Sequence, residues 1–200
     1  MTKFDSFKTF NLSQSMLDVL ENKGFLRPTP IQVHVIPLLM KGDRDIIGQA
    51  QTGTGKTAAF GIPIIEKLTG NAASIQALVL TPTRELALQV SEELGSLRGD
   101  KNIRIVPLYG GQAIKNQLKE LTSGADIVVG TPGRIIDHLK RGNIKLALSP
   151  ILYLTKQMRC STWVSLKMLR RYSGAQMRTS KCCCSQQLCL RLYSSSQKST

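Results

Sequence analysis

The sequence lacks the features that would place it in a membrane or in the secretory pathway. It contains no run of 18 apolar residues, and its start, MTKFDSFKTF, does not show the charged-then-apolar pattern of a signal peptide. We therefore expect a cytoplasmic protein that does not bind membranes. Its 200 residues, 42% of them hydrophobic, suffice for one domain with a core but not for two domains of ordinary size. A function that needs two large lobes would be incomplete in this chain.

Acidic side chains are missing from the last part of the chain. No Asp or Glu follows Asp137, and residues 149–200 contain nine of the 27 Lys and Arg residues. All five cysteines and ten serines also lie in residues 149–200. The net charge of +14 by itself suggests a polyanionic partner, but most of it comes from this tail. We infer that two different compositions meet near residue 149.

Residues 1–148 alternate helical and strand patterns. Ser13 is a predicted helix N-cap, and Thr29 followed by Pro30 opens a second predicted helix. Short apolar runs typical of strands occur at residues 45–47, 77–80, 103–108 and 126–129. Helical patterns, for example at residues 86–97, separate these runs. This order predicts an α/β fold with a parallel sheet covered on both faces, in which ligands bind at the carboxyl ends of the strands.

The first loop after an apolar run has the sequence AQTGTGKT, at residues 50–57. Its glycines let backbone N–H groups converge on phosphate oxygens, its lysine supplies a positive charge, and its threonine hydroxyl at a helix start can bind Mg²⁺. We therefore predict that a nucleotide is bound by Ala50, Gln51, Thr52, Gly53, Thr54, Gly55, Lys56 and Thr57, with Thr57 contacting Mg²⁺ through ATP. Ala50 replaces the first glycine of the general pattern. The loop alone leaves kinases, motors and helicases open, and a glycine-rich turn without a ligand is the alternative.

Four further motifs lie in order around this loop: GFLRPTPIQ (24–32), PTRELA (82–87), YGG (109–111) and TPGR (131–134). With these motifs, residues 4–148 resemble the first of the two RecA-like domains of the DEAD-box family of ATP-dependent RNA helicases. The resemblance implies a RecA-like P-loop domain with ATP and Mg²⁺ as cofactors and RNA as the partner. It also implies that residues 4–32 form the family's Q motif.

Two residues of the Q motif are predicted to recognise adenine. A glutamine amide offers a donor and an acceptor that match the edge of adenine, so Gln32 would give a preference for ATP. A glutamine on a helix surface is the alternative. By the resemblance, Phe7 packs on the adenine ring, and an ordinary core phenylalanine is the alternative.

The remaining motifs are predicted to bind RNA without reading bases. Backbone N–H groups at helix starts and arginine side chains suit phosphate oxygens. The resemblance assigns backbone contacts to Pro82, Thr83, Arg84, Gly110, Gly111, Thr131, Pro132, Gly133 and Arg134. A salt bridge for Arg84 and a tight turn at the two glycines are alternatives compatible with this role. His34 and His138 lack a cysteine or carboxylate cluster at ligand spacing, so we expect surface or packing residues and no structural metal.

The acidic residues that the family uses for hydrolysis are absent. Such an ATPase needs an Asp to orient the Mg²⁺ shell and a carboxylate to position water, which in the family are the first two residues of Asp-Glu-Ala-Asp. In their place this chain reads SPILYLTKQMRCSTWVSLKML, at residues 149–169, so no catalytic residue is intact. When the last base of each codon is joined to the first two of the next, residues 154–158 can spell Asp-Glu-Ala-Asp. Residues 181–189 can likewise spell a stretch containing Ser-Ala-Thr, the family's next motif.

We therefore predict that residues 1–148 are a truncated helicase ATP-binding domain and that residues 149–200 are an out-of-frame, disordered tail that forms no domain. A pseudogene, a sequencing error and a programmed frame change all remain open. The loss of strands beside the phosphate-loop strand would leave unpaired sheet edges. Three adjacent cysteines, Cys182, Cys183 and Cys184, do not have the C-x-x-C spacing of a zinc site. A basic RNA-binding arm is an alternative interpretation of the tail.

The predicted function follows from these two parts. By family, the protein couples ATP binding and hydrolysis to RNA duplex unwinding, but the chain as written is expected to be deficient in hydrolysis. A non-catalytic module that binds ATP and RNA, and a nonfunctional gene remnant, are the alternatives. A cooperative thermal transition that ATP shifts would favour the module.

Overall fold

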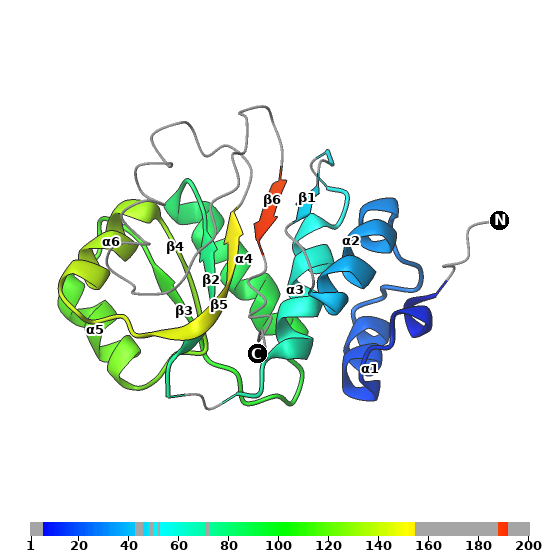
Figure 1. Ribbon diagram of the computed structural model, residues 1–200, viewed down its shortest axis with the longest axis horizontal. Coiled ribbons are helices and arrows are strands. Elements are labelled where there is room, and N and C mark those ends of the chain that lie inside the picture. The colour runs from blue at the N-terminus through cyan, green and yellow to red at the C-terminus, as the bar shows by residue number, and fades with distance from the viewer. Residues whose placement is uncertain are drawn as a thin grey trace, which may run out of the picture.

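The computed structural model describes residues 6–42, 46–48, 50–51, 53–70, 73–154 and 188–191. Its helices are η1 (Phe7–Phe10, a 3₁₀ helix), α1 (Gln14–Asn22), α2 (Pro30–Lys41), α3 (Lys56–Lys67), α4 (Arg84–Leu97), α5 (Ile114–Thr122) and α6 (Pro132–Lys140). Its strands are β1 (Ile46–Gly48), β2 (Ile75–Leu80), β3 (Ile105–Leu108), β4 (Ile127–Gly130), β5 (Leu146–Leu154) and β6 (Leu188–Arg191). From β1 to β5 strands and helices alternate, and the sequence predicts this alternation as far as β4 (Figure 1).

Capping residues, two of them predicted, mark where three of the helices begin. The hydroxyl of Ser13 accepts a hydrogen bond from the N–H of Met16 at 3.3 Å at the start of α1. Thr29 precedes α2, and Pro30 is its first residue, where a missing N–H costs no intrahelical bond. The hydroxyl of Thr83 accepts from the N–H of Leu86 at 3.3 Å at the start of α4. Local sequence signals thus fix these three helix starts.

The six strands form one sheet in the order β1-β6-β5-β2-β4-β3. Strands β3, β4, β2 and β5 pair with one another in parallel, whereas β6 is antiparallel to both β5 and β1. Because two antiparallel steps restore the direction, β1 runs the same way as β5 and β2. The loops that follow β1, β2, β3 and β4 therefore all leave the same edge of the sheet.

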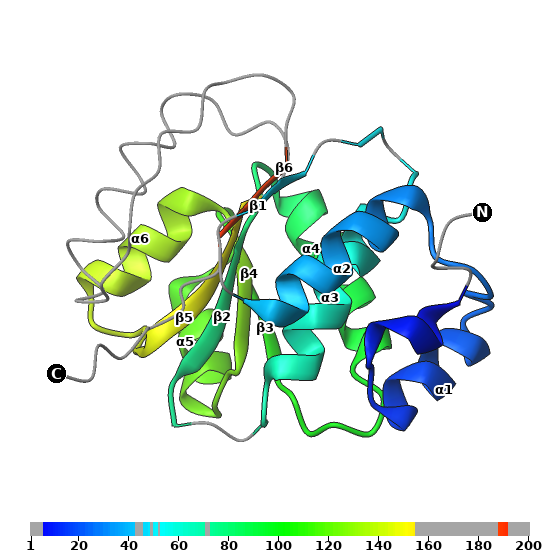
Figure 2. The same ribbon diagram turned by 45° about the vertical axis from the view of Figure 1, so that its right-hand side comes forward.

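Helices cover both faces of the sheet. Ala77 and Val79 of β2 pack in a core with residues of α1 to α4, whereas Leu78 and Leu80 pack in a second core with Ile135 of α6. Figure 2 shows α1, α2 and α3 on one side of the sheet and α5 and α6 on the other. The alternation of side chains along a buried strand produces these two cores. The predicted α/β fold with a doubly covered sheet is confirmed.

Two segments of the predicted tail are strands. Residues 151–154 of β5 pair with β2, from Ala77 opposite Ile151 to Leu80 opposite Leu154. Strand β6 lies between β1 and β5. Within the tail predicted to be disordered, residues 149–154 and 188–191 therefore pair in the sheet, and the predicted open edge beside β1 is paired. That residues 149–200 form no domain stays a prediction. Short apolar runs such as ILYL and LCL favour strands, and β1 and β2 leave backbone groups that need partners. Residues 155–187 and 192–200, with Cys182, Cys183 and Cys184, lie outside the described residues.

Among the residues that the structure describes, no helix combines the length and the apolar character needed to cross a bilayer.

Candidate nucleotide and RNA site

The phosphate-binding loop joins β1 to α3 and requires glycine at two positions. Gly53 has φ +78° and Gly55 has φ +76°, in the left-handed region that side chains rarely adopt. A Cβ atom added to Gly55 would lie 2.6 Å from Nε2 of Gln32, whereas one added to Gly53 would have no neighbour within 4 Å. Gly55 is thus required by its backbone conformation and also by the close approach of α2. Thr52 lies outside the described residues.

Hydrogen bonds join the Q motif to this loop. The Thr29 hydroxyl donates to the carbonyl of Thr54 at 2.9 Å, and Nε2 of Gln32 donates to the carbonyl of Gly55 at 3.2 Å. Oε1 of Gln32 accepts from the N–H of Thr29 at 2.9 Å, which fixes the orientation of the amide. The structure thereby brings together residues of two motifs that lie 25 and 23 positions apart in the sequence.

Gln32 is buried, with 3% of its surface exposed, so the surface-helix alternative is wrong. An amide group has two N–H donors and two acceptor lone pairs. The bonds to Gly55 and Thr29 use one of each. The amide therefore keeps one donor and one acceptor position, which is the complement that adenine recognition requires. Recognition of adenine by Gln32 stays a prediction.

The lysine of the loop is bound by the loop itself. Nζ of Lys56 donates to the carbonyls of Ala50, at 2.9 Å, and of Gln51. The hydroxyl of Thr54 donates to the same Gln51 carbonyl at 2.7 Å. Anionic phosphate oxygens form charge-assisted hydrogen bonds that are about twice as strong as bonds to neutral groups. A bound phosphate would therefore compete well with these carbonyls for the ammonium group.

The donor set fits Mg²⁺ that arrives with a nucleotide. Thr57 is the second residue of α3, and its hydroxyl oxygen is a ligand type that Mg²⁺ accepts. Within the described ranges, no three His, Cys, Asp or Glu side chains form a group that could hold a metal ion. Mg²⁺ binds proteins mainly through substrate phosphates, water and a few protein oxygens. Thr57 would therefore be one ligand of an ion held chiefly by phosphate oxygens.

Phe7 lies in the core, in agreement with the alternative that it is an ordinary core phenylalanine. It is 4% exposed and packs edge-to-face against Phe10, with ring centroids 5.9 Å apart and an angle of 79°. Packing on an adenine ring stays a prediction.

The loop after β2 contacts the loop after β3. Thr83 and Arg84 are exposed at the start of α4, whereas Pro82 is half-buried. The guanidinium carbon of Arg84 lies 4.8 Å from the centre of the Tyr109 ring. Arg84 therefore makes a cation–π contact with Tyr109, where the sequence analysis gave a salt bridge as one alternative. Hydrogen bonds from its own backbone N–H and from the Thr83 hydroxyl lower the pKa of Glu85, which keeps a negative charge at this helix start.

The loops after β3 and β4 also lie together. Gly110 and Gly111 are exposed, and Gly111 has φ +85°. The N–H of Thr131 donates to the carbonyl of Leu108 at 2.9 Å, and a side chain at Gly130 would overlap that carbonyl. Around the start of α6, Gly133 is exposed, whereas Thr131, Pro132 and Arg134 are half-buried. The predicted RNA residues thus gather at the edge that carries the phosphate-binding loop.

A buried polar network behind these loops was missed from the sequence. Gln117 and His138 are both fully buried, and Nε2 of His138 lies 3.1 Å from Oε1 of Gln117. Burial, and then the nearby Arg134 and Arg141 charges, lower the pKa of His138, so its ring is neutral at pH 7. The structure thus agrees with a packing role for His138 and a surface position for His34. The available signal was Gln117 itself, a polar residue within the apolar stripe of a helix.

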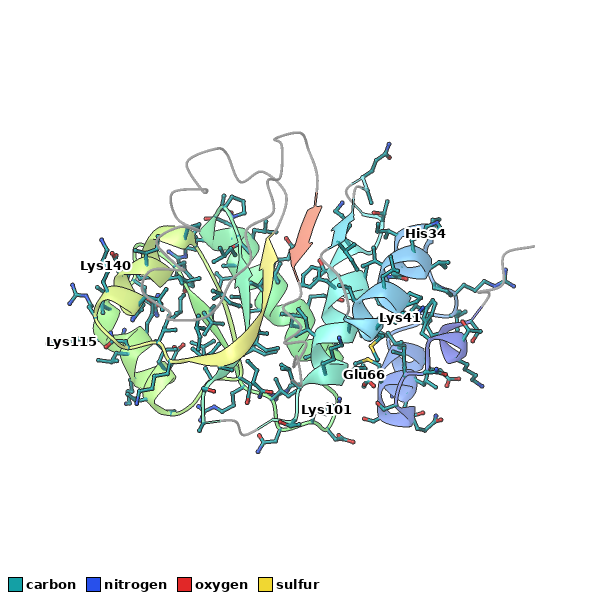
Figure 3. The ribbon with its side chains drawn as sticks, in the orientation of Figure 1. His34, Lys41, Glu66, Lys101, Lys115 and Lys140 are labelled. Atoms are coloured by element: carbon teal, nitrogen blue, oxygen red, sulfur yellow. The ribbon has the colours of Figure 1, made fainter. Side chains whose placement is uncertain are left out.

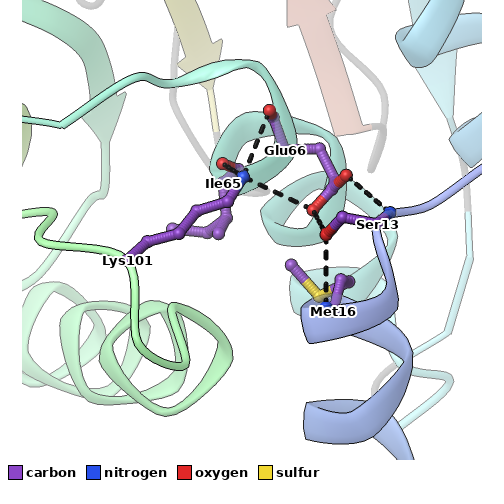
Figure 4. A network of polar contacts seen from close by, with 5 residues as sticks. All are labelled: Ser13, Met16, Ile65, Glu66 and Lys101. Carbon is purple, nitrogen blue, oxygen red and sulfur yellow. Dashed lines mark hydrogen bonds and ion pairs between the residues drawn. The ribbon is translucent and has the colours of Figure 1, made fainter.

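A second network ties the Q motif to the far end of α3. Figure 3 places Glu66 and Lys101 near that end, and Figure 4 shows the contacts. Glu66 accepts hydrogen bonds from the N–H of Ser13 at 3.0 Å and from its hydroxyl at 2.8 Å. Nζ of Lys101 lies 3.4 Å from the same carboxylate and donates to the carbonyl of Ile65 at 2.8 Å. The helix that begins at the phosphate-binding loop is therefore bonded at both ends.

The fold and these loops define a P-loop domain of the helicase class. The chain belongs to the DEAD/DEAH box helicase family, whose model matches residues 29–155. It is 52% identical over 141 residues to the DEAD-box ATP-dependent RNA helicase CshA of Geobacillus kaustophilus, covering 70% of this chain and 30% of that protein. It is 51% identical over 144 residues to the probable ATP-dependent RNA helicase MJ0669 of Methanocaldococcus jannaschii, covering 72% and 39%. The chain thus spans less than two fifths of the length of these relatives.

Solved structures agree with this assignment. The crystal structure of a DEAD box protein from Methanococcus jannaschii matches with a TM-score of 0.72 and 45% identity, over 83% of this chain and 45% of that one. Saccharomyces cerevisiae Dbp5 bound to RNA and ADP BeF3 matches with a TM-score of 0.73 and 28% identity, over 84% and 44%. The family resemblance and the RecA-like fold are confirmed.

Proposed function

We propose that this chain is the ATP-binding part of a DEAD-box RNA helicase that binds Mg²⁺-ATP and the RNA backbone but does not hydrolyse ATP at the rate of an intact enzyme. The proposal rests chiefly on the pair of hydrogen bonds from Thr29 and Gln32 to the backbone of Thr54 and Gly55. These bonds place a predicted base-recognition residue directly against a phosphate-binding loop. A nucleotide with adenine at one end and phosphates at the other matches that arrangement.

The RNA part of the proposal rests on the shared edge of the sheet. The loops after β2, β3 and β4 present exposed backbone at Thr83, Gly110, Gly111 and Gly133. Arg84 and Arg134 provide positive charge at the same loops. Backbone N–H groups and arginines are the groups that bind phosphates without reading base sequence. Dbp5, a structural relative, is described as bound to RNA.

Nucleotide binding is tested by calorimetry with Mg²⁺-ATP on the full chain, on Lys56→Ala and on Lys41→Ala. Lys41 ends α2 before β1, at the opposite end of that strand from the phosphate-binding loop, so it is the matched control. A charge-assisted contact contributes about 1.5 to 3 kcal/mol, so Lys56→Ala should weaken binding by roughly tenfold to a hundredfold. Lys41→Ala should bind like the unaltered chain. Equal affinity of Lys56→Ala and the unaltered chain would refute the assignment of the loop.

RNA binding is tested with a labelled single-stranded oligouridylate at several salt concentrations. Arg84→Met should lower affinity and reduce the slope of log K against log salt by about 0.7, the value for one phosphate contact on a single strand. Lys41→Met removes the same charge elsewhere and should leave the slope unchanged. A chain that neither binds RNA nor melts cooperatively with a shift by ATP would favour the gene remnant instead.

The deficiency in hydrolysis rests on the absence of any acidic residue after Asp137. The proposal that residues from about 149 onward are out of frame is supported by the family match, which ends at residue 155. It is also supported by β6, the one antiparallel strand among the described strands, which lies within the proposed out-of-frame stretch.

The nucleotide sequence around codon 149 tests the frame directly. Shifting the frame there should restore an Asp and a Glu beside the carboxyl end of β5. Since a positioned general base contributes about 10² to 10⁴ in rate, the corrected product should hydrolyse ATP well above the chain as written. RNA-stimulated hydrolysis by the 200-residue chain, abolished by Lys56→Ala, would show that the acids are not needed where we place them.

A further inference from the structure

We propose that Gln117 is a positioning residue for RNA binding, because its buried amide holds the Gly110 and Gly111 turn and the Arg134 side chain in one fixed arrangement. The inference rests on the proposed function, since the turn and Arg134 belong to the predicted RNA contacts. Gln117 itself is fully buried and would not touch RNA.

All four hydrogen-bonding positions of the Gln117 amide have partners. Its Nε2 donates to the carbonyl of Tyr109 at 3.0 Å and to Oε1 of Gln112 at 2.9 Å. Its Oε1 accepts from Nη1 of Arg134 at 3.3 Å and lies 3.1 Å from Nε2 of His138. Tyr109 and Gln112 are the residues on either side of the two glycines. One side chain of α5 therefore contacts both flanks of one loop and the arginine of the next.

The partners determine which way round the amide lies. Tyr109 and Gln112 offer oxygens, so the NH₂ group must face them, and Arg134 offers only N–H donors, so the oxygen must face it. Asn143 determines the tautomer of His138, because its Nδ2 lies 3.2 Å from Nδ1 of His138 and can only donate. Nδ1 of His138 is then the acceptor, and its protonated Nε2 donates a hydrogen bond to Oε1 of Gln117. The network has a single consistent arrangement.

Arg134 is shared between the two loops. Its Nη1 also donates to the carbonyl of Gln112 at 3.0 Å. A guanidinium group has five N–H donors, so these bonds orient the group and leave further donors for phosphate oxygens. A free arginine would lose rotamer freedom on binding RNA, whereas this one is already oriented.

Packing alone does not explain a glutamine at this position. Its helical neighbours Ile114, Leu118 and Leu121 form the apolar stripe of α5, and an apolar residue at 117 would continue it. Burying an amide gives little net stability, because its bonds to water are lost, but it fixes geometry when all of its partners are present. The benefit of Gln117 is therefore the arrangement of the loops.

The test compares Gln117→Met with Asn116→Met in the full chain. Methionine keeps the length of glutamine but removes all four bonds, whereas Asn116 is exposed on the same helix and serves as the matched control. Hydrogen exchange of the RNA-free protein should become faster at residues 109–113 and 131–135 together in Gln117→Met. Its affinity for labelled oligouridylate should fall about tenfold, while the affinity for Mg²⁺-ATP stays within about twofold. Asn116→Met should change none of these values.

Two further variants keep the inference testable. Gln117→Glu retains acceptors for Arg134 and His138 and should recover part of the RNA affinity lost in Gln117→Met. If Gln117→Met does not fold, Asn143→Ala removes only the outermost partner and should loosen both loops to a smaller degree.

The outcomes separate this inference from the proposed function. RNA binding by the unaltered chain that Gln117→Met leaves intact overturns the inference alone, as does unchanged hydrogen exchange in the two loops. An equal loss of ATP and RNA affinity overturns it too, because that result indicates general unfolding. A different outcome would be that the unaltered chain binds no RNA while Gln117→Met still loosens the two loops together. That outcome would overturn the proposed RNA binding, and only the structural coupling of the two loops by Gln117 would stand.

Discussion

Replacing Gly55 by alanine should destabilise the protein more than replacing Gly53, although the two glycines lie in the same loop and have nearly the same φ. Both substitutions put a side chain into the left-handed region, which costs about 1 to 2 kcal/mol. Both also reduce the freedom of the unfolded chain by a similar amount. These contributions cancel when the two variants are compared.

The difference between the variants arises from Gln32. A Cβ at position 55 would lie 2.6 Å from Nε2 of Gln32, so that amide must move and its bond to the Gly55 carbonyl, 3.2 Å long, is lost. A neutral hydrogen bond contributes about 0.5 to 1.5 kcal/mol, and a buried donor left without a partner costs about 1 to 3 kcal/mol. We expect Gly55→Ala to be less stable than Gly53→Ala by about 1 to 2 kcal/mol.

Thermal unfolding without nucleotide measures this difference. For a chain of this size, 1 kcal/mol shifts Tm by about 2 to 4 °C, so the two variants should differ by roughly 2 to 8 °C. Gln32→Ala should make the Gly55→Ala substitution less costly, because the clashing amide is gone. Equal Tm values for the two glycine variants, or no relief in the Gln32→Ala background, would refute the claim that α2 presses against the phosphate-binding loop.

Two further substitutions test the networks around the site. Burial lowers the pKa of His138 below its ordinary value of 6.5, so below about pH 6.5 the unfolded chain binds a proton that the native protein does not, and stability falls as the pH falls. His138→Gln should flatten the dependence of Tm on pH between about 7.5 and 5.5, and an unchanged slope in this variant would contradict the buried position of His138. Glu66→Gln weakens the bonds to Ser13 and Lys101 and should lower Tm by about 2 to 8 °C, for a loss of about 1 to 2 kcal/mol. Glu92→Gln, at an exposed site on α4, should have almost no effect, and equal effects of the two would mean that Glu66 does not stabilise the contact between α1 and α3.

Local signals in the sequence were enough for most of the elements. Ser13, Thr29 and Thr83 each mark a helix start, because a capping hydroxyl or a following proline acts within three residues of its position. Strands β1 to β4 were predicted within a few residues, since β2 and β4 are buried on both faces and are continuous apolar runs, whereas β5 and β6 were not predicted. The loops at the carboxyl ends followed from the parallel order of the strands.

Contacts between distant residues were not predictable in the same way. Nothing near Glu66 indicates that its partners are Ser13 and Lys101, since the contact depends on how α1 and α3 pack. Gln117 was overlooked because one polar residue in an apolar stripe is also compatible with a helix that turns a side chain to solvent. Both contacts become visible only when the elements have been placed in three dimensions.

Strand β6 shows that a segment can pair as a strand of the sheet without bringing ligand-binding residues to the edge that carries the site. Backbone pairing needs only extended residues of suitable propensity, so an apolar segment such as LCLR can pair with β1 and β5 in either direction. In its antiparallel direction Leu188 lies opposite Gly48, so the amino end of β6 is at the edge that carries the phosphate-binding loop. Ligand-binding residues of this fold follow the carboxyl ends of parallel strands, and a reversed strand presents none of them at that edge. We propose that a sheet completed in this way supports the binding loops without supplying the acidic residues that hydrolysis would need.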